Sequence, residues 1–208
     1  QLALLPQLPE VARQRRLDVE SFYMSTLMWA ERFDEALRQL QHVRVAYAAE
    51  LAEDPGLQVR LTDNEAEMAL LRQQFAQFHR LRPWDGLGSG SRQPSAPGRA
   101  SYHWMFHAQA ALLENRPQRL YEATRALAES ALADFEAGNP NRGVFAGYAI
   151  GFLLQLDPGA ETEALYQRTL RWHERQFGSE SWYLYQLLQL RLHALQRHER
   201  LDEAEALY

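Results

Sequence analysis

The sequence contains no cysteine and no lysine, and the two absences exclude several kinds of chemistry. Without cysteine the chain has no disulfide scaffold, no thiol nucleophile and no cysteine metal ligand. Because all 22 basic residues are arginine, it also lacks a Schiff-base lysine and a phosphate-binding loop. We interpret the exclusive use of arginine as codon bias in a GC-rich, bacterial genome. The absence of cysteine fits the bacterial cytoplasm, the expected location, but also fits many secreted bacterial proteins.

Long apolar runs, an excess of basic charge and enzyme motifs are missing as well. No apolar run is long enough to cross a membrane, and the net charge of −5 argues against a nucleic-acid partner. The chain has no Gly-x-Ser-x-Gly motif and no dinucleotide-binding fingerprint. We therefore expect no enzymatic activity, no catalytic residues, no cofactor, no nucleic-acid partner and no membrane insertion.

An internal repeat of 42 residues is the strongest signal in the sequence. The segment Glu-Ala-Leu-Tyr at 163–166 returns at 205–208, which is 42 residues later. The segment Glu-Arg-Phe-Asp-Glu-Ala at 31–36 returns four periods later, with Leu for Phe, at 199–204. Stepping by this period from two apolar positions of one helix face predicts ten apolar positions, and all ten are apolar. They are Met24, Leu27, Ala66, Ala69, Ala108, Ala111, Ile150, Leu153, Leu192 and Leu195.

Two helices are expected in each 42-residue unit. The predicted helices are 17–31, 34–53, 57–80, 100–114, 117–137, 141–156, 159–177, 180–197 and 200–208. In the second unit the period places the second helix near Phe75 or Ala76, but we expect one long helix, 57–80, to replace the pair. A Gly/Ser/Pro-rich segment, 83–98, follows and predicts a flexible loop. This loop is interpreted as a tolerated insertion, and a docking loop anchored by Trp84 is the alternative.

The stretch from Arg197 to Tyr208 resembles the turn and second-helix start of the tetratricopeptide repeat (TPR) family, in the 42-residue form of kinesin-light-chain-type arrays. Arg-Gln-Phe-Gly-Ser at 175–179 is similar to the helix end of those arrays, whereas Gly159 and Thr162 depart from the usual aromatic and alanine of the turn. The resemblance implies an all-α, right-handed superhelical array of antiparallel helix pairs, an α-solenoid of about five units with the second degenerate. It implies one repeat domain over 1–208, which we expect to be part of a longer protein, and no chemistry.

A concave groove lined by the first helices of the units is a further implication of the resemblance. Stepping the period along the mostly polar column of those helices assigns the groove surface. The assigned residues are Asp18, Ser21, Ser25, Arg60, Asp63, Glu67, Tyr102, Gln109, Gln186, Gln189 and His193. Aromatic residues on first helices are expected mostly to fill gaps between units, but with glutamine and histidine they also suit a bound peptide.

The expected function is therefore a non-enzymatic scaffold that binds a protein or peptide partner in the groove. One alternative is a ligand- or peptide-sensing regulatory domain of a bacterial signalling protein, and another is self-association through the terminal repeat. His103 and His107 have the i, i+4 spacing of two metal ligands, but no third ligand is marked. Since Tyr102, Trp104 and Phe106 surround them in sequence, we expect these histidines to pack and expect no metal site.

Overall fold

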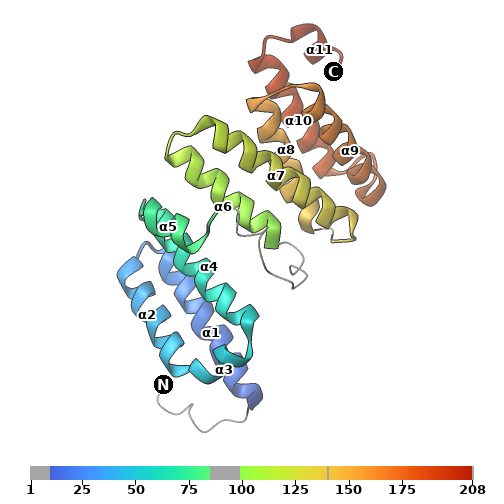
Figure 1. Ribbon diagram of the computed structural model, residues 1–208. Helices are drawn as coiled ribbons and strands as arrows, with labels where there is room; N and C mark the ends of the chain where they lie inside the picture. Colours follow the sequence, from blue (N-terminus) through green and yellow to red (C-terminus); the bar gives the residue numbers. More distant parts are fainter. Residues whose placement is uncertain (1–9, 85–98, 140, 208) are drawn as a thin grey trace. The chain divides into compact units, whose positions relative to one another are not determined.

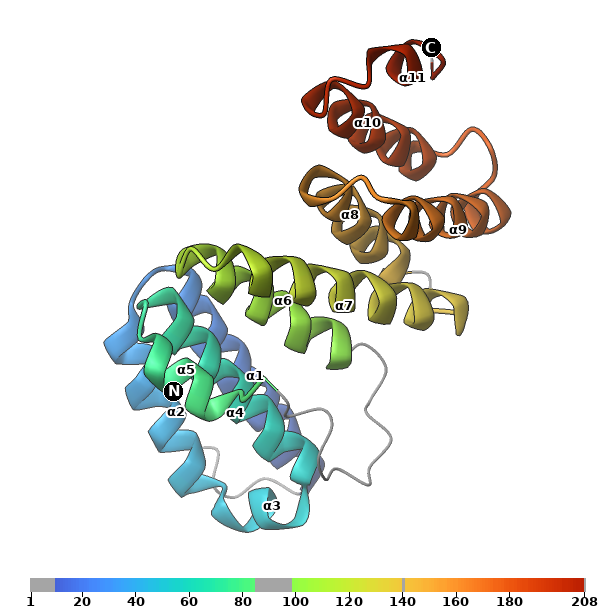
Figure 2. The same cartoon turned by 45° about the horizontal axis from the view of Figure 1, so that its top comes forward.

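The computed structural model describes residues 10–84, 99–139 and 141–207, and over these ranges the chain is helical with no strand. The expected all-α fold of packed helices is confirmed for these residues. The chain divides into two compact units, residues 1–83 and 84–208. Each unit is described by itself, and Figures 1 and 2 show the helices of both.

The first unit contains five helices in its described residues. They are α1 (Glu10–Trp29), α2 (Phe33–Ala46), α3 (Ala48–Glu53), α4 (Pro55–Leu71) and α5 (Phe75–Leu81). Leucines and methionines of α1, α2 and α4 form its core, together with the buried ring of Tyr47. The Asp54 carboxylate caps α4 by accepting the Leu57 N–H at 3.1 Å, and Pro55 occupies the first turn, where no N–H is needed.

The single helix expected over 57–80 is wrong. The chain turns at 72–74 and starts α5 at Phe75, the position that the 42-residue period indicates. The turn depends on Gln73, whose φ of 56° is left-handed and ends α4. The expected helix 34–53 is also divided, at Tyr47, into α2 and α3. Composition of the following Gly/Ser/Pro-rich segment was therefore a poor guide, and local periodicity was the better one.

The second unit contains six helices in its described residues. They are α6 (Arg99–Leu113), α7 (Pro117–Glu136), α8 (Asn141–Leu156), α9 (Ala160–Phe177), α10 (Trp182–Arg197) and α11 (Leu201–Glu205). Helix α6 packs along α7, α7 packs on α8, and α8 contacts both α9 and α10 (Figure 1). The Ser181 hydroxyl caps α10 by accepting the Leu184 N–H, and Gly178, at φ 84°, ends α9. The expected helix 200–208 is shorter than predicted and ends at Glu205.

One turn geometry recurs along both units. Glu31, Gln73, Asn115 and Glu199 all have φ between 54° and 58°, and their spacings are 42 or twice 42 residues. The residue after each donates its N–H to the carbonyl five residues earlier, as in a Schellman motif. These bonds are Arg32 to Leu27, Gln74 to Ala69, Arg116 to Ala111 and Arg200 to Leu195, at 2.8–2.9 Å. The repeat found in the letters is therefore also present in the backbone.

The turn between α8 and α9 is the exception, and its sequence explains why. Pro158 stands where the other turns have the N–H donor, and proline has none. The Asp157 carboxylate instead accepts the Gly159 N–H at 3.0 Å. The acceptor carbonyls of the other four turns belong to Leu27 and its counterparts in the column of predicted apolar pairs. Of the ten residues in those pairs, eight are buried, and Ala108 and Leu192 are half-buried.

Three glycines on α8, four residues apart, allow neighbouring helices to approach it closely. A Cβ added to Gly143 would lie 2.9 Å from the Phe135 ring of α7. A Cβ on Gly151 would lie 2.6 Å from Leu190 Cδ1 and 2.8 Å from Leu190 Cβ of α10. Both distances are too short for a side chain, so glycine sets the spacing of α7 and α10 on α8.

None of the helices in the described ranges combines the length and the apolar character that a membrane crossing requires.

Candidate binding face

Exposed aromatic side chains gather on α6, α8 and α10, the first helices of the helix pairs in the second unit. On α8 they are Phe145, Tyr148 and Phe152, which lie three and four residues apart and so share one helix side. We call the aromatic face the set formed by these residues with their neighbours on α6 and α10. Its members are Tyr102, Phe145, Tyr148, Phe152, Tyr183, Tyr185, Gln186 and Gln189.

Contacts between side chains connect the three helices across this face. The rings of Tyr102 on α6 and Phe145 on α8 have centroids 6.1 Å apart. The Gln186 amide of α10 lies 3.5 Å from the Tyr148 hydroxyl of α8, at the limit of a hydrogen bond. Phe145 and Tyr148 therefore link α6 to α10 through one side of α8.

A small cleft opens in the face between α8 and α10. Gly147 contributes only backbone to it, which leaves room beside the Tyr148 and Tyr183 rings. The cleft is lined by Val144, Gly147, Tyr148, His173, Tyr183, Gln186, Leu187 and Leu190. Nearby, the Gln189 amide donates to the Tyr185 hydroxyl at 2.6 Å. The cleft thus presents aromatic rings together with amide and phenol groups that form hydrogen bonds.

His173 of α9 lies at the base of the cleft. It is buried against the Phe135 ring, at a centroid distance of 4.8 Å, and its Nδ1 lies 3.0 Å from the Thr169 carbonyl oxygen. That contact requires the proton on Nδ1, which donates to the carbonyl. Burial lowers the pKa of His173 below its ordinary value, although the backbone contacts oppose the shift. The base of the cleft is therefore uncharged at neutral pH.

Acidic residues are absent from the sequences of α6, α8 and α10, although the chain contains 27. The second helices differ, because α7 and α9 carry carboxylates in ion pairs. Arg125 contacts Glu129 at 3.0 Å and Glu161 at 2.5 Å, and Arg168 pairs with Glu136. The two sets of helices therefore present chemically different surfaces, and the aromatic face has no carboxylate of its own.

The groove residues predicted for the second unit lie on α6 and α10. Tyr102, Gln109, Gln189 and His193 are exposed, and Gln186 is half-buried beside the cleft. The structure brings Tyr102 to α8 and Gln186 to the cleft, as described above. Whether these five residues bind a partner stays a prediction.

Sequence stepping missed the α8 part of the face. Its column on α8 passes through Gly147 and Gly151, which Leu187 and Leu190 of α10 cover. The exposed side of α8 is instead turned toward Phe145, Tyr148 and Phe152. Their spacing of three and four residues was a usable signal, but apolar residues at that spacing normally predict a buried side.

The groove residues predicted for the first unit lie on α1 and α4. Asp18 and Arg60 are exposed, while Ser21, Ser25, Asp63 and Glu67 are half-buried. Asp63 forms an ion pair with the buried guanidinium of Arg82, and Ser25 donates to the Ser21 carbonyl at 3.2 Å. Burial raises the pKa of Glu67, and the nearby Arg82 charge lowers it in part. Some polar groups of this column therefore contribute to the internal structure of the unit.

The buried carboxylate of Glu20 also has a structural explanation. It accepts hydrogen bonds from Arg16 at 2.9 Å, Tyr47 at 3.1 Å and Gln39 at 3.3 Å. Burial, with the adjacent Glu20 charge, raises the pKa of Tyr47 to about 12. These contacts connect α1 to α2 and to the start of α3, so Glu20 stabilises the packing of the unit.

His103 and His107 of α6 are buried within an aromatic cluster. Their ring centroids are 4.5 Å apart, and the Trp84 ring lies 5.1 Å from that of His107. The Arg119 guanidinium stands 4.9 Å above Trp84. Across the described parts of the chain, no group of three or more potential ligands could hold a metal ion. Trp84 packs beside α6, and the rest of the predicted loop, 85–98, lies outside the described residues.

Comparison of the chain with protein-family models, with curated proteins and with solved structures finds no match. The similarity to TPR arrays therefore depends on the residues around the turn at 197–208 and on the 42-residue period. Neither comparison nor resemblance assigns a ligand, so the argument for function begins from the chemistry of the aromatic face.

Proposed function

We propose that this chain is a non-enzymatic scaffold that binds a peptide segment of a partner protein on the aromatic face. The observation that carries the proposal is the connected row of exposed rings and amides on three successive first helices. Tyr102, Phe145 and Tyr148 are each at least one-third exposed, although large aromatic side chains are usually better buried. An exposed aromatic patch with polar tips is typical of a surface that a partner covers.

The side chains of the face suit peptide recognition. Tyrosine gives a large contact area and loses little conformational entropy, because it has only two rotatable side-chain bonds. Its hydroxyl and the Gln186 amide supply hydrogen bonds that orient a peptide backbone. Rings beside a cleft such as that between Tyr148 and Tyr183 are common centres of binding energy.

The proposal includes a TPR-like architecture, with about five 42-residue units in a right-handed superhelix. The left-handed turn residues at 42-residue intervals and the buried apolar pairs beside them support this architecture. In such an array the first helices line the concave side, which places the aromatic face in the groove. The covered face of α8 explains why the groove residues there are aromatic rather than those of the stepped column.

Selection of random displayed peptides on the immobilised full chain tests the function. Selected peptides are expected to bind the chain and to lose at least about tenfold in affinity to a Tyr148→Ala, Gln186→Ala double variant. The matched control is Trp29→Ala, which removes an exposed ring of the first unit, 86% exposed, and should leave binding unchanged. Circular dichroism establishes that both variants are folded. Peptides whose binding is the same for the chain and the double variant would contradict the proposed site.

A further inference from the structure

We propose that the peptide recognised by the aromatic face is proline-rich and bound in the polyproline II conformation. This inference rests on the proposed function and adds the chemical class of the partner. It follows from three properties of the face: its hydrogen-bond donors, its ring surfaces and its lack of charge.

Hydrogen-bond donors without carboxylate acceptors are the first property. Tyr148, Gln186 and Gln189 provide hydroxyl and amide donors, while α6, α8 and α10 contain no Asp or Glu. A proline-rich chain has carbonyl acceptors at every residue but few N–H groups, because proline lacks one. In the polyproline II helix these carbonyls form no internal hydrogen bonds, so they are free to accept from the face.

Ring surfaces beside a narrow cleft are the second property. Tyr148 and Tyr183 border the cleft, and Phe145 continues the surface toward α6. Proline-rich segments dock in aromatic-lined grooves, where pyrrolidine rings pack against aromatic rings. The polyproline II helix is already extended before binding, so its association costs less conformational entropy than that of a flexible peptide.

Low charge is the third property, and it favours a neutral partner over an acidic one. An acidic peptide needs accessible cations, but the Arg191 guanidinium of α10 is paired with Glu163 at 2.9 Å and lies 5.0 Å from the Tyr166 ring centroid. Its side chain is only 17% exposed. His173 at the base of the cleft is held neutral by burial, as argued above. Attraction to a negatively charged peptide is therefore weak at this face.

Calorimetric titration of the full chain with three synthetic peptides tests the inference. The peptides are a polyproline of about ten residues, which is long enough for three turns of the helix, and Gly/Ser-rich and Glu-rich peptides of equal length. Polyproline is expected to bind at least about tenfold more tightly than either of the others. Tyr148→Ala should weaken polyproline binding about tenfold, Tyr148→Phe should weaken it less, and Trp29→Ala should not change it.

The outcomes separate this inference from the proposed function. Tighter binding of the Glu-rich peptide, or equal binding of all three, overturns the polyproline assignment. Polyproline binding that survives Tyr148→Ala in a variant shown to be folded overturns the site. If the peptides selected from the random library need Tyr148 but contain no proline, the function stands and this inference fails. If neither the library nor polyproline binds, both fail together.

Discussion

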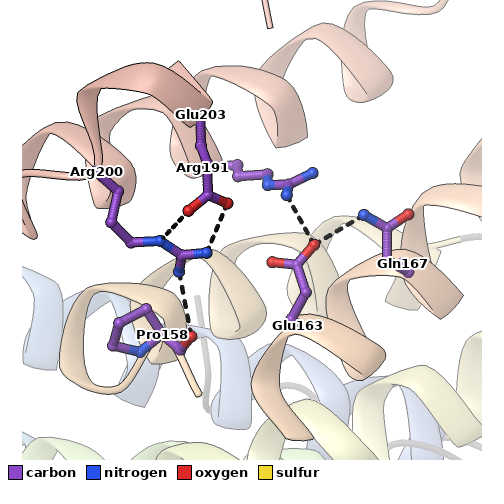
Figure 3. Close-up of polar contacts among 6 residues, drawn as sticks. All are labelled: Pro158, Glu163, Gln167, Arg191, Arg200 and Glu203. Carbon is purple, nitrogen blue, oxygen red and sulfur yellow. Dashed lines mark hydrogen bonds and ion pairs between the residues drawn. The ribbon is translucent and has the colours of Figure 1, made fainter. Parts of the chain in front are cut away.

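The Arg200 side chain donates a hydrogen bond to the carbonyl oxygen of Pro158, 42 residues earlier in the chain, at 3.3 Å (Figure 3). The same guanidinium binds Glu203 through two bonds of 2.6 Å. Beside it, Glu163 accepts from Arg191 at 2.9 Å and from Gln167 at 2.8 Å. Arg200 thus connects the turn before α11 to the turn before α9, one repeat period away. A contact of this kind between successive units is the way that repeat proteins transmit stability.

Replacement of Arg200 by alanine should loosen α11 while the rest of the second unit stays folded. The helix has only five residues, and the contacts of Arg200 with Pro158 and Glu203 hold its first turn. We expect faster hydrogen exchange at the amides of 201–205 and unchanged exchange in α7. The control is Arg32→Ala, which breaks the corresponding pair with Glu35 in the first unit. Unchanged exchange in α11 of the Arg200 variant would contradict the role given to this arginine.

Alanine at Gly151 and at Gly147 should have different effects on stability. The new Cβ at 151 would meet the Cβ of Leu190 as well as its end, so α10 must move, and we expect a loss of about 1–3 kcal/mol. At 147 the nearest atom, 3.2 Å away, is the flexible Leu187 Cδ2. The helix propensity gained there, up to about 1 kcal/mol, should offset the crowding. Urea unfolding of both variants measures the difference, and equal stability would contradict the close approach of α10.

Glycine at the left-handed turn positions should stabilise the protein. Glu31 has φ 58°, which strains a residue with a side chain, so Glu31→Gly should add about 1 kcal/mol to the unfolding free energy. Asp157 occupies the corresponding place before Pro158, but its carboxylate caps the turn by accepting the Gly159 N–H. Asp157→Gly should therefore destabilise the protein. Thermal melting of the two variants checks the opposite signs, and a shift of the same sign in both would be inconsistent with this description of the turns.

Acidification should weaken the second unit through His173. Its pKa is lowered in the folded state from the 6.5 of an ordinary histidine, so folding favours the neutral ring. The stability that it contributes is fully present above pH 6.5 and is lost as the pH falls toward the lowered pKa. Melting temperatures between about pH 7.5 and about pH 5.5 should fall more for the native chain than for His173→Gln, which cannot titrate in this range. Parallel curves for the two proteins would exclude this histidine as the cause.

Much of the fold could be predicted because its signals are local. Helix ends at Asp54 and Pro117 follow from capping and from the missing proline N–H, and the 42-residue period located the turns, including the one that starts α5 at Phe75. The error over 57–80 arose where a remote feature, the composition after residue 83, was given more weight than that period. The break of the second helix at Tyr47 has no signal that we can identify in the sequence.

By itself, the sequence determined the helical class, the repeat period and the buried side of the first helices, since these depend on spacing along one chain. Only the tertiary structure decided which side chains of α8 are exposed. Leu187 and Leu190 of α10 cover Gly147 and Gly151 because glycine leaves room for them, and the Phe145 and Tyr148 side of α8 is left open. Such exposure depends on how closely two helices approach, and that distance is set by the fit of side chains far apart in the sequence.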